Sequence, residues 1–552
     1  MNTEQLIEAL LDPNSYPHPV EVITTIETHI SIVFLTGQFA YKLKKPVDFG
    51  FLNFSTLENR KHFCKLEVSL NQRTAPELYL GVYEIHKCEE LQSQNLTKKT
   101  PPTPTLGNFT ITKAGYKDSS KTSQPIDYLV KMQQFNPNHV LGKMLKQDCE
   151  LNMELLEKLA VQISQFHKNA ELVKVNSEFG KPEAQLQPML DNFPTLFKLF
   201  ANDSKIIQHL KRLQSWTLES FNELKPTIAY RRKNGFVKAC HGDLHLDNIA
   251  IINESPLLFD GIEFNDHFRW IDMISDIAFL LIDLEFRGKD NASYQTLSLY
   301  LSKTLDYKSL ILLNFYRVYR TLVRAKITAL RAQQINQDSY EQQQTLNLSQ
   351  QYIQQAHSYI LTSRSPKLIL MQGVSGSGKS HLANTLQEQL KLNAIIISSD
   401  RIRKTLFGVN STHRVNELEK AKLYSSTMNA KTYSALLEYA KESLCCGFNV
   451  IVDATLLKKI HRQKFYALAS SINIKPYLIS MQTQPEFAKK TIQLRLKNNL
   501  NPSDANVDIM LKQINAIDPP DASENAITLS SEQVWKIFPK ERLQEFLELP
   551  ID

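Results

Sequence analysis

The eight residues from Gly373 to Ser380 constrain the fold of this chain more than any other stretch. They fit the pattern Gly-x-x-x-x-Gly-Lys-Ser, in which glycines let successive backbone N–H groups curl around phosphates at the start of a helix. The apolar run Leu368–Met371 precedes the pattern and a helical stretch follows it, which is the context that such a loop requires. The sequence therefore predicts a nucleotide-binding loop in which Lys379 reaches the phosphates and Ser380 ligates magnesium. The loop consists of Gly373, Val374, Ser375, Gly376, Ser377, Gly378, Lys379 and Ser380.

A second phosphate-handling pattern lies upstream of this loop. His-Gly-Asp at positions 241–243 is followed by Asn248 and, after the apolar run Leu257–Phe259, by Asp260. Phosphoryl transfer requires an oriented hydroxyl and metal ions that hold the phosphates. We therefore expect Asp243 to orient the acceptor hydroxyl, and Asn248 and Asp260 to ligate magnesium. The Asp-x-x-x-x-Asn spacing is common and by itself favours a capping turn. The preceding His-Gly, the strand and carboxylate that follow, and a strand lysine upstream favour catalysis.

A lysine on an upstream strand completes this pattern. Lys42 ends an Ala-x-Lys segment and is expected to reach the α- and β-phosphates. Glu67, on the predicted helix Leu57–Leu70, would hold that lysine through an ion pair, although a surface position on the helix is an alternative. Lys44 and Lys45 are rivals for the role of Lys42, and Lys44 points to the same face of a period-two strand. The sequence leaves open which lysine contacts phosphate.

The amino-terminal half changes from strands to helices along the chain. Residues from about 20 to 135 are strand-rich, with a hairpin predicted from Ile30–Leu35 and Phe39–Leu43. Residues from about 140 to 335 are mostly helical in pattern. The segment Gln333–Gln355 is rich in glutamine and poor in apolar residues, and it predicts a polar helical linker.

Strands and helices alternate after Pro366. The strands Leu368–Met371, Ala394–Ser398 and Asn449–Val452 are continuously apolar, which indicates burial on both faces and hence a parallel sheet. The predicted organisation is an α+β domain over residues 1–335, a helical glutamine-rich linker over residues 336–365, and an α/β P-loop domain over residues 366–552.

The His-Gly-Asp pattern and the residues around it resemble the aminoglycoside phosphotransferase-like kinases, which carry His-Gly-Asp where protein kinases carry His-Arg-Asp. The resemblance covers roughly residues 25–330 and includes the stretch from Trp270 to Ala278, in which that family usually has an aspartate that supports the catalytic loop. It implies a protein-kinase-like fold, with a strand-rich lobe and a helical lobe, and a small-molecule substrate that need not be an aminoglycoside. Protein kinases have a Gly-x-Gly-x-x-Gly loop that covers the nucleotide phosphates, whereas this chain has only Gly37 at that place. The sequence therefore does not show how this loop contacts the phosphates. A closer resemblance is to uncharacterised bacterial proteins that fuse such a domain to a P-loop kinase-like domain.

Two carboxylates follow strands in the P-loop half. Asp400 would orient an acceptor hydroxyl, and Asp453 would lie beside the metal. The Asp-x-x-Arg spacing from Asp400 to Arg403 resembles that of the polynucleotide kinase, zeta-toxin and gluconate kinase-like group. Arg495 lies on a later helix, where kinases of that group carry a lid arginine. That group usually has another arginine four residues later, where this chain has Asn499. Helix capping by Asp400 and solvent-exposed positions for the two arginines are the alternatives.

Three arginines share one face of a predicted helix at spacings of three and four residues: Arg317, Arg320 and Arg324. Their charges repel unless a carboxylate or an anion compensates them. One interpretation is that they pair with Asp283 and Glu285 within the fold. The other is that they form an anionic substrate or inter-domain site.

Composition limits the partners of the chain. The formal net charge is +7 over 552 residues, and the basic residues are scattered, which suits polyphosphate substrates and does not by itself indicate nucleic acid. The longest apolar runs are far shorter than the ~20 residues that cross a bilayer, so no membrane association is expected. The first residues lack the basic start and apolar core of a secretory signal. We therefore expect a cytoplasmic protein.

The sequence predicts an ATP-dependent phosphotransferase with two nucleotide sites, which uses Mg²⁺ and transfers the γ-phosphate to a hydroxyl of a small-molecule acceptor. Two alternatives remain. In one, the P-loop half is a regulatory NTPase that gates the amino-terminal kinase. In the other, it is a nucleic-acid end kinase, which is disfavoured because no aromatic-and-basic platform for single strands is evident. The acceptor, the preference for ATP over GTP and the oligomeric state stay open.

Overall fold

The computed structural model describes residues 3–50, 52–87, 109–114, 124–147, 149–336, 339–361, 365–411, 413–497 and 503–550. The chain divides into two compact units. The first consists of Met1–Glu150, Phe166–Pro188 and Thr227–Asp276, and the second of Leu151–Gln165, Met189–Pro226 and Ile277–Asp552. Each unit gathers segments that are far apart in the sequence. The domain boundaries expected near residues 335 and 366 remain a prediction.

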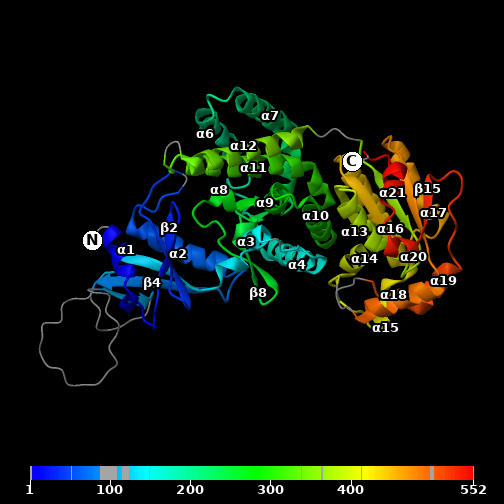
Figure 1. Ribbon diagram of the computed structural model, residues 1–552, viewed down its shortest axis with the longest axis horizontal. Helices are drawn as coiled ribbons and strands as arrows, with labels where there is room; N and C mark the ends of the chain where they lie inside the picture. Colours follow the sequence, from blue (N-terminus) through cyan, green and yellow to red (C-terminus); the bar gives the residue numbers. More distant parts are fainter. Residues whose placement is uncertain are drawn as a thin grey trace, which may run out of the picture. The chain divides into compact units, whose positions relative to one another are not determined.

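The first unit is built on a six-stranded antiparallel sheet with the strand order β1-β2-β3-β6-β4-β5 (Figure 1). The predicted hairpin is present, and Phe34 of β2 pairs with Tyr41 of β3. The strands are β1 (Thr24–Glu27), β2 (Ser31–Leu35), β3 (Phe39–Lys44), β4 (Tyr79–Lys87), β5 (Phe109–Lys113) and β6 (Asp127–Gln133).

Strand β3 is buried on both faces, because each face of the sheet is covered. Tyr41 and Leu43 belong to an apolar cluster with Leu6 and Leu10 of helix α1 (Thr3–Leu10). Because side chains alternate along a strand, Lys42 and Lys44 point to the opposite face. Helix α2 packs on that face against β4 and β6.

Helix α2 (Leu57–Asn71) matches the predicted helix and begins where the Thr56 side chain accepts a hydrogen bond from the backbone N–H of Asn59. Its inner face carries Cys64 and Val68 together with the fully buried Glu67. A buried carboxylate is costly unless it is paired. The position of Glu67 on this face therefore requires cationic partners.

Two short strand pairs carry the loops of the His-Gly-Asp pattern. Strand β7 (Val237–Ala239) pairs with β10 (Trp270–Asp272), and β8 (Ile249–Ile252) pairs with β9 (Ser255–Leu258). The loop between β7 and β8 contains Asp243 and Asn248, and Asp260 follows β9. The remaining helices of this unit are α3 (Leu141–Lys146) and α8 (Asp266–Arg269), and four helices have residues in both units: α4 (Met153–Asn169), α5 (Pro182–Leu190), α7 (Ser204–Lys233) and α9 (Met273–Phe286).

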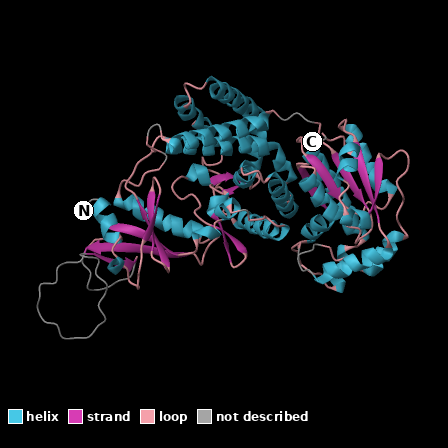
Figure 2. Cartoon of the chain, viewed as in Figure 1, coloured by secondary structure: helices cyan, strands magenta, loops and turns pink. Residues whose placement is uncertain are grey.

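The second unit contains a helical part and a parallel sheet (Figure 2). The helical part includes α6 (Asn192–Leu199), α10 (Asp290–Thr304), α11 (Leu310–Ala332) and α12 (Tyr340–Ile360). Helix α12 occupies the expected linker, but it is not merely a solvated connection. Tyr352, Ile353 and Ala356 are buried in an apolar cluster with Val318 and Leu322 of α11. The glutamine-rich composition concealed this narrow apolar face.

The parallel sheet has five strands in the order β12-β13-β11-β14-β15, with the first strand of the segment at its centre. The loop from Gly373 to Ser380 leads from β11 into α13. The strands are β11 (Leu368–Gln372), β12 (Ala394–Ser398), β13 (Asn449–Asp453), β14 (Pro476–Gln482) and β15 (Ala526–Ser530). The helices are α13 (Lys379–Gln389), α14 (Ser399–Phe407), α15 (Glu417–Leu423), α16 (Ser426–Cys445), α17 (Lys459–Ser471), α18 (Pro485–Lys497), α19 (Val507–Ile514), α20 (Ser531–Lys536) and α21 (Lys540–Phe546).

This architecture confirms the predicted fold class. An antiparallel sheet with an associated helix precedes a mostly helical region, and a parallel α/β P-loop sheet follows. Of the helices that the structure describes, none combines the length and apolar character needed to span a bilayer.

Candidate functional sites

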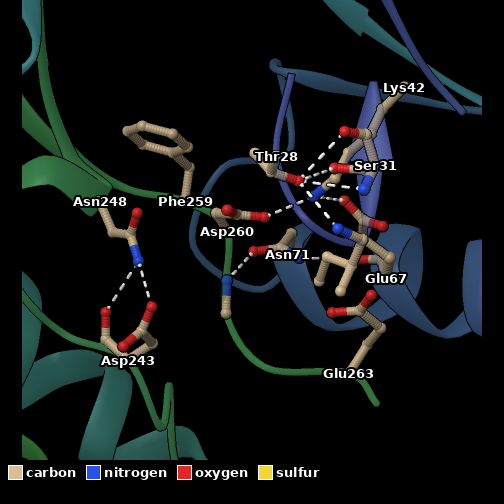
Figure 3. Close-up of polar contacts among 12 residues, drawn as sticks. Thr28, Ser31, Lys42, Glu67, Asn71, Asp243, Asn248, Phe259, Asp260 and Glu263 are labelled. Carbon is tan, nitrogen blue, oxygen red and sulfur yellow. Dashed lines mark hydrogen bonds and ion pairs between the residues drawn. The ribbon is translucent and has the colours of Figure 1, made fainter. Parts of the chain in front are cut away.

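The first site centres on the Lys42 side chain, which joins a strand, a helix and a loop (Figure 3). Lys42 Nζ donates to Glu67 Oε1 at 2.8 Å and to Asp260 Oδ1 at 2.7 Å. The Asp260 side chain is 44% exposed, whereas Glu67 is fully buried. Lys42 thus pairs on its buried side with Glu67 and on its exposed side with Asp260, the expected metal-binding carboxylate. This arrangement can hold a phosphate and its metal ion.

Lys44 occupies a different environment from Lys42. Its ammonium donates to Glu67 Oε2 at 2.5 Å and also pairs with Glu263, which follows Asp260 by three residues. The Lys44 side chain is 1% exposed. Glu263 was not among the residues singled out from the sequence. A charged residue in the short apolar context Gly-Ile-Glu-Phe is the signal that could have identified it.

The loop between β7 and β8 brings Asp243 and Asn248 together. Asn248 Nδ2 donates to Asp243 Oδ2 at 2.9 Å and to the Asp243 backbone carbonyl at 2.9 Å. His245 Nε2 lies 3.2 Å from the same carboxylate oxygen. In the view of Figure 3, Asp260 lies between this pair and the Lys42–Glu67 pair. The structure therefore gathers all five residues predicted for the first site in one unit.

Asp276 supports the backbone of this loop. Its two carboxylate oxygens accept hydrogen bonds from the backbone N–H groups of His241 at 3.0 Å and Gly242 at 2.9 Å. The buried His167 ring also lies 3.0 Å from Asp276 through Nε2. Gly242 has φ +83°, and a Cβ there would lie 2.7 Å from the Phe268 carbonyl oxygen. Only glycine meets both conditions without strain, which explains the glycine of the His-Gly-Asp pattern.

The loop that carries Asp260 is fixed by hydrogen bonds from the other side of the site. The backbone N–H of Asp260 donates to Tyr79 Oη at 3.1 Å, and that of Gly261 donates to Asn71 Oδ1 at 2.8 Å. Asp260 itself has φ +60°, an uncommon conformation for a residue with a side chain. Such local strain persists where surrounding contacts hold it, and it is typical of functional positions.

Charge at the first site follows from its burial. Burial alone would raise the pKa of Glu67, but the ammonium groups of Lys42 and Lys44 outweigh it and lower that pKa to about 2. Burial lowers the pKa of His241, so its imidazole is neutral at physiological pH. Its Nε2 lies 2.9 Å from the Phe259 carbonyl oxygen, which identifies Nε2 as the protonated nitrogen.

The second site is the P-loop. Ser380 Oγ donates to Asp453 Oδ2 at 2.7 Å, and Lys379 Nζ donates to the Val374 carbonyl oxygen at 2.8 Å. A hydroxyl beside a carboxylate offers the hard oxygen ligands that Mg²⁺ prefers. Gly376 has φ +85°, and a Cβ there would lie 2.7 Å from the Ala488 carbonyl oxygen. The glycine thus lets the loop approach the backbone of α18.

A cavity of about 1370 Å³ opens above the P-loop within the second unit. Asp400, Arg403 and Asp453 line it together with Lys379. Arg403 donates to Asp400 Oδ1 at 3.2 Å and to Asn429 Oδ1 at 3.2 Å. The two strand-end carboxylates and the lysine predicted for this site therefore face one cavity, which has room for a nucleotide and a small acceptor.

Aromatic side chains form another part of this cavity. Trp535 stacks on His381 with ring centroids 4.5 Å apart, and Phe487 meets Trp535 edge-on at 6.3 Å. All three line the cavity. Nothing in the sequence pattern marked Trp535, which enters the site from α20, far along the chain from the P-loop. Arg495 belongs to α18, but its side chain, like Asn499, lies outside the part of the chain that the structure describes.

The three arginines of α11 lie in the helical part of the second unit. Arg317 is buried and donates to Glu285 Oε1 at 2.8 Å. Arg320 lies over the Phe279 ring at 5.1 Å, and Arg324 lies over the Tyr352 ring at 5.8 Å. These surroundings favour the structural interpretation of this face over the substrate-binding one.

Comparison with known proteins agrees with the division of motifs. Residues 368–520 match the family model described as AAA domain. The uncharacterized protein Rv2004c of Mycobacterium tuberculosis (strain ATCC 25618 / H37Rv) is 28% identical over 444 residues, which cover 79% of this chain and 80% of that protein. An alignment that spans 79% of this chain necessarily includes both the His-Gly-Asp segment and the P-loop.

Two solved structures are each similar to a part of the chain. A choline/ethanolamine kinase family protein from Mesorhizobium loti is 11% identical with a TM-score of 0.36, and the match covers 65% of this chain and 95% of that one. A gluconokinase from Sinorhizobium meliloti 1021 is 19% identical with a TM-score of 0.23, and the match covers 34% of this chain and 98% of that one. Both scores are low over the full chain. Residues 368–520, which contain the P-loop, are thus similar to the AAA domain family, and the amino-terminal region is built on an antiparallel sheet.

Proposed function

We propose that this chain is an ATP-dependent phosphotransferase with two nucleotide sites, each of which transfers a γ-phosphate to a hydroxyl of a small-molecule acceptor. The observation that carries the proposal is the meeting of Lys42, Glu67 and Asp260 beside the Asp243–Asn248 pair. These are the parts that phosphoryl transfer requires: a cation for the phosphates, oxygen ligands for a metal ion and a carboxylate for the acceptor hydroxyl.

The residues of the first site divide the chemistry among them. Asp243, with a side chain that is 34% exposed, accepts the hydrogen bond of the acceptor hydroxyl and orients its oxygen towards the γ-phosphorus. Lys42 exchanges its contact with Asp260 for a phosphate oxygen while it keeps Glu67. Asn248 and Asp260 supply oxygen ligands that would hold Mg²⁺, which neutralises charge on the phosphates when it is bound.

At the P-loop site, different residues would bind the phosphates, hold the metal ion and orient the acceptor. Lys379 and the backbone N–H groups of the loop bind the phosphates, and Ser380 and Asp453 would hold Mg²⁺. Asp400 orients the second acceptor, and Arg403 holds that carboxylate in place. Within a lining that is mostly apolar, Asp400, Arg403 and Asn429 offer polar contacts to the hydroxyl groups of an acceptor.

A regulatory role of the P-loop half is the second candidate function. Asn499 stands where related kinases usually carry another lid arginine, and loss of that charge would weaken catalysis more than nucleotide binding. In this case nucleotide at the P-loop site would change the activity of the first site without being consumed.

An acceptor screen on the full chain tests these functions. ATP consumption is measured against sugars, amino alcohols, aminoglycosides, nucleosides and oligonucleotides for the wild type, Asp243→Asn and Asp400→Asn. Two kinase sites predict acceptors that lose turnover with one variant and keep it with the other. Turnover that depends on Asp243 alone supports a regulatory P-loop half, and turnover on oligonucleotides that depends on Asp400 supports an end kinase. Turnover that survives both substitutions contradicts the proposal.

A further inference from the structure

Both oxygens of the Glu67 carboxylate are occupied by lysines. Oε1 accepts from Lys42 at 2.8 Å, and Oε2 accepts from Lys44 at 2.5 Å. An ion pair between one lysine and one glutamate would leave one carboxylate oxygen without a cation. Here the second lysine fills that position, so the Glu67 side chain is held from both sides.

The two lysines differ in their access to solvent and ligand. The Lys42 side chain is 11% exposed, and its second partner, Asp260, lies at the open edge of the site. The Lys44 ammonium lies 4.8 Å from the centre of the Phe54 ring, and its second partner, Glu263, is 5% exposed. Lys42 thus lies towards the exposed edge of the site, where the nucleotide would bind. Lys44 lies in the buried part, between Phe54 and Glu263. A phosphate can reach only the first without breaking buried contacts.

The carboxylates beside the two lysines belong to a single loop. Asp260 pairs with Lys42 at its beginning, and Glu263 pairs with Lys44 at its end. The backbone N–H of Gly261 between them is held by Asn71 of α2, the helix that also carries Glu67. The loop is therefore tied at three points to strand β3 and helix α2, and Figure 3 draws two of these contacts, those with Lys42 and Asn71.

The charges of this cluster explain why Glu263 is needed. Lys42 and Lys44 would repel each other across Glu67 alone, and burial disfavours an ammonium that lacks a full counter-charge. With Glu263 present, the buried part of the cluster contains two ammonium and two carboxylate groups. Asp260 is then the additional carboxylate, and it can leave Lys42 for a metal ion while the buried charges stay balanced.

We propose that Lys44 and Glu263 are positioning residues of the first site: they clamp Glu67 and the Asp260 loop, so that Lys42 alone exchanges a carboxylate for a nucleotide phosphate. This inference rests on the nucleotide binding proposed for that site. Neither residue touches the reacting atoms. Their effect reaches the ligand through the orientation of Glu67 and Asp260, as supporting residues act around metal sites.

The test isolates the first site in the full-length chain. Lys379→Ala serves as the reference, because it removes the phosphate-binding lysine of the P-loop. Calorimetry then measures the affinity for a nonhydrolysable ATP analogue with Mg²⁺ and again with EDTA. Glu263→Gln in this background should weaken binding of the analogue with Mg²⁺ about 10-fold, which is the lower end of the range for loss of a residue that orients metal ligands. The same substitution should weaken binding in EDTA by a smaller factor.

Matched variants separate positioning from general stability. Lys44→Met should have an effect similar to that of Glu263→Gln, and the double variant should lose less affinity than the product of the two single losses, because the residues act as a pair. Lys45→Met removes the adjacent lysine, whose partner Glu27 is exposed, and should leave affinity within about 2-fold. If Glu263→Gln does not fold, Glu263→Asp keeps the charge, shortens the reach and should still weaken binding.

Two results would overturn the inference and can be told apart. If the reference chain binds no nucleotide, the function proposed for the first site fails and the inference fails with it. If the reference binds, but Glu263→Gln and Glu263→Asp lower the melting temperature without changing the Mg²⁺-dependent affinity, only the inference fails. Lys44 and Glu263 would then be a buried ion pair with a structural role alone.

Discussion

Lys42 Nζ lies 2.7 Å from Asp260 Oδ1, a contact that joins residues 218 positions apart in the chain. The pair connects the central strand of the amino-terminal sheet to the loop after β9. Its lysine is almost buried, and its carboxylate is 44% exposed. A ligand that approaches from the open side therefore meets the carboxylate first and can separate it from the lysine.

Replacement of this lysine should weaken nucleotide binding at the first site. In the Lys379→Ala background, Lys42→Met removes the cation that would contact phosphate and leaves Asp260 without its partner. We expect a loss of about 10-fold or more in affinity for an ATP analogue with Mg²⁺, because hydrogen bonds to charged groups contribute about 1.5–3 kcal/mol. Calorimetry measures the loss, with Lys45→Met as the control. If Lys42→Met and the control bind the ATP analogue equally well, Lys42 does not contact the nucleotide.

Asp243→Asn should abolish turnover at the first site and leave nucleotide binding intact. In the proposed function this carboxylate acts on the acceptor, whereas Lys42 and Asp260, which pair with each other, hold the nucleotide and its metal ion. Loss of a general base costs about 10²–10⁴-fold in rate. The measurement compares the turnover of the identified acceptor with nucleotide affinity in the same preparation. A variant with turnover within about 2-fold of the wild type would contradict the role of Asp243.

Lys379→Ala should remove one of two nucleotide sites. The ammonium of Lys379 lies within the P-loop, bonded to the Val374 carbonyl oxygen at 2.8 Å, from where it can turn to phosphate. Titration of the wild type with an ATP analogue and Mg²⁺ should show about two sites per chain, and the variant should show one. A single site in the wild type that is unchanged by Lys379→Ala would mean that the P-loop does not bind nucleotide.

Local patterns were sufficient to predict much of this molecule. Helix α2 was expected at Leu57–Leu70 and extends over Leu57–Asn71, and the strand Ala394–Ser398 has the expected bounds. The P-loop was predictable because strand, loop and helix are contiguous in the sequence. Strand β15 (Ala526–Ser530) was missed, because it lies at the edge of the sheet and its partly exposed alternating pattern lacks a continuous apolar run.

Other contacts between distant residues could not be predicted from local patterns. Lys42 and Lys44 point to the same face of β3, so periodicity cannot distinguish them, and only their exposure and partners do. Glu263 is 219 positions from Lys44 in the chain, and no local pattern connects the two. Trp535 also lines the P-loop cavity from a distant part of the chain, and no local pattern connects it to the P-loop. The sequence suggested candidate reactive groups for each site more readily than the residues that hold them in position.

Cysteine reactivity provides an independent check of the packing of α2. Burial raises the pKa of the Cys64 thiol to about 12, and it raises the pKa of Cys446 to about 12 as well. At pH 8 only about one Cys64 thiol in 10⁴ is the reactive thiolate, whereas Cys445 is exposed. Brief treatment of the native chain with iodoacetamide should therefore modify Cys445 and spare Cys64, as measured by mass spectrometry. Urea-unfolded chain, in which both react, is the control, and equal labelling in the native chain would contradict the burial of α2.

Arg317→Ala should destabilise the second unit without changing nucleotide binding. The guanidinium of Arg317 is buried and donates to Glu285 Oε1, whose carboxylate also accepts from Tyr359 Oη. Removal of the arginine leaves a buried carboxylate without its cation, which costs about 3–5 kcal/mol. Urea denaturation should show this loss. Lys308→Ala, at the exposed pair with Glu438, is a control that should cost less than about 1 kcal/mol.

The substrate-binding interpretation of the same arginine predicts the opposite distribution of effects. If this face of α11 bound an anionic acceptor, Arg317→Ala would raise the KM for that acceptor and leave stability nearly unchanged. The buried Glu285 favours the structural outcome, because a carboxylate already compensates the guanidinium and an anion would have to displace it. A raised acceptor KM in a variant with wild-type stability would therefore show that the ion pair opens during turnover.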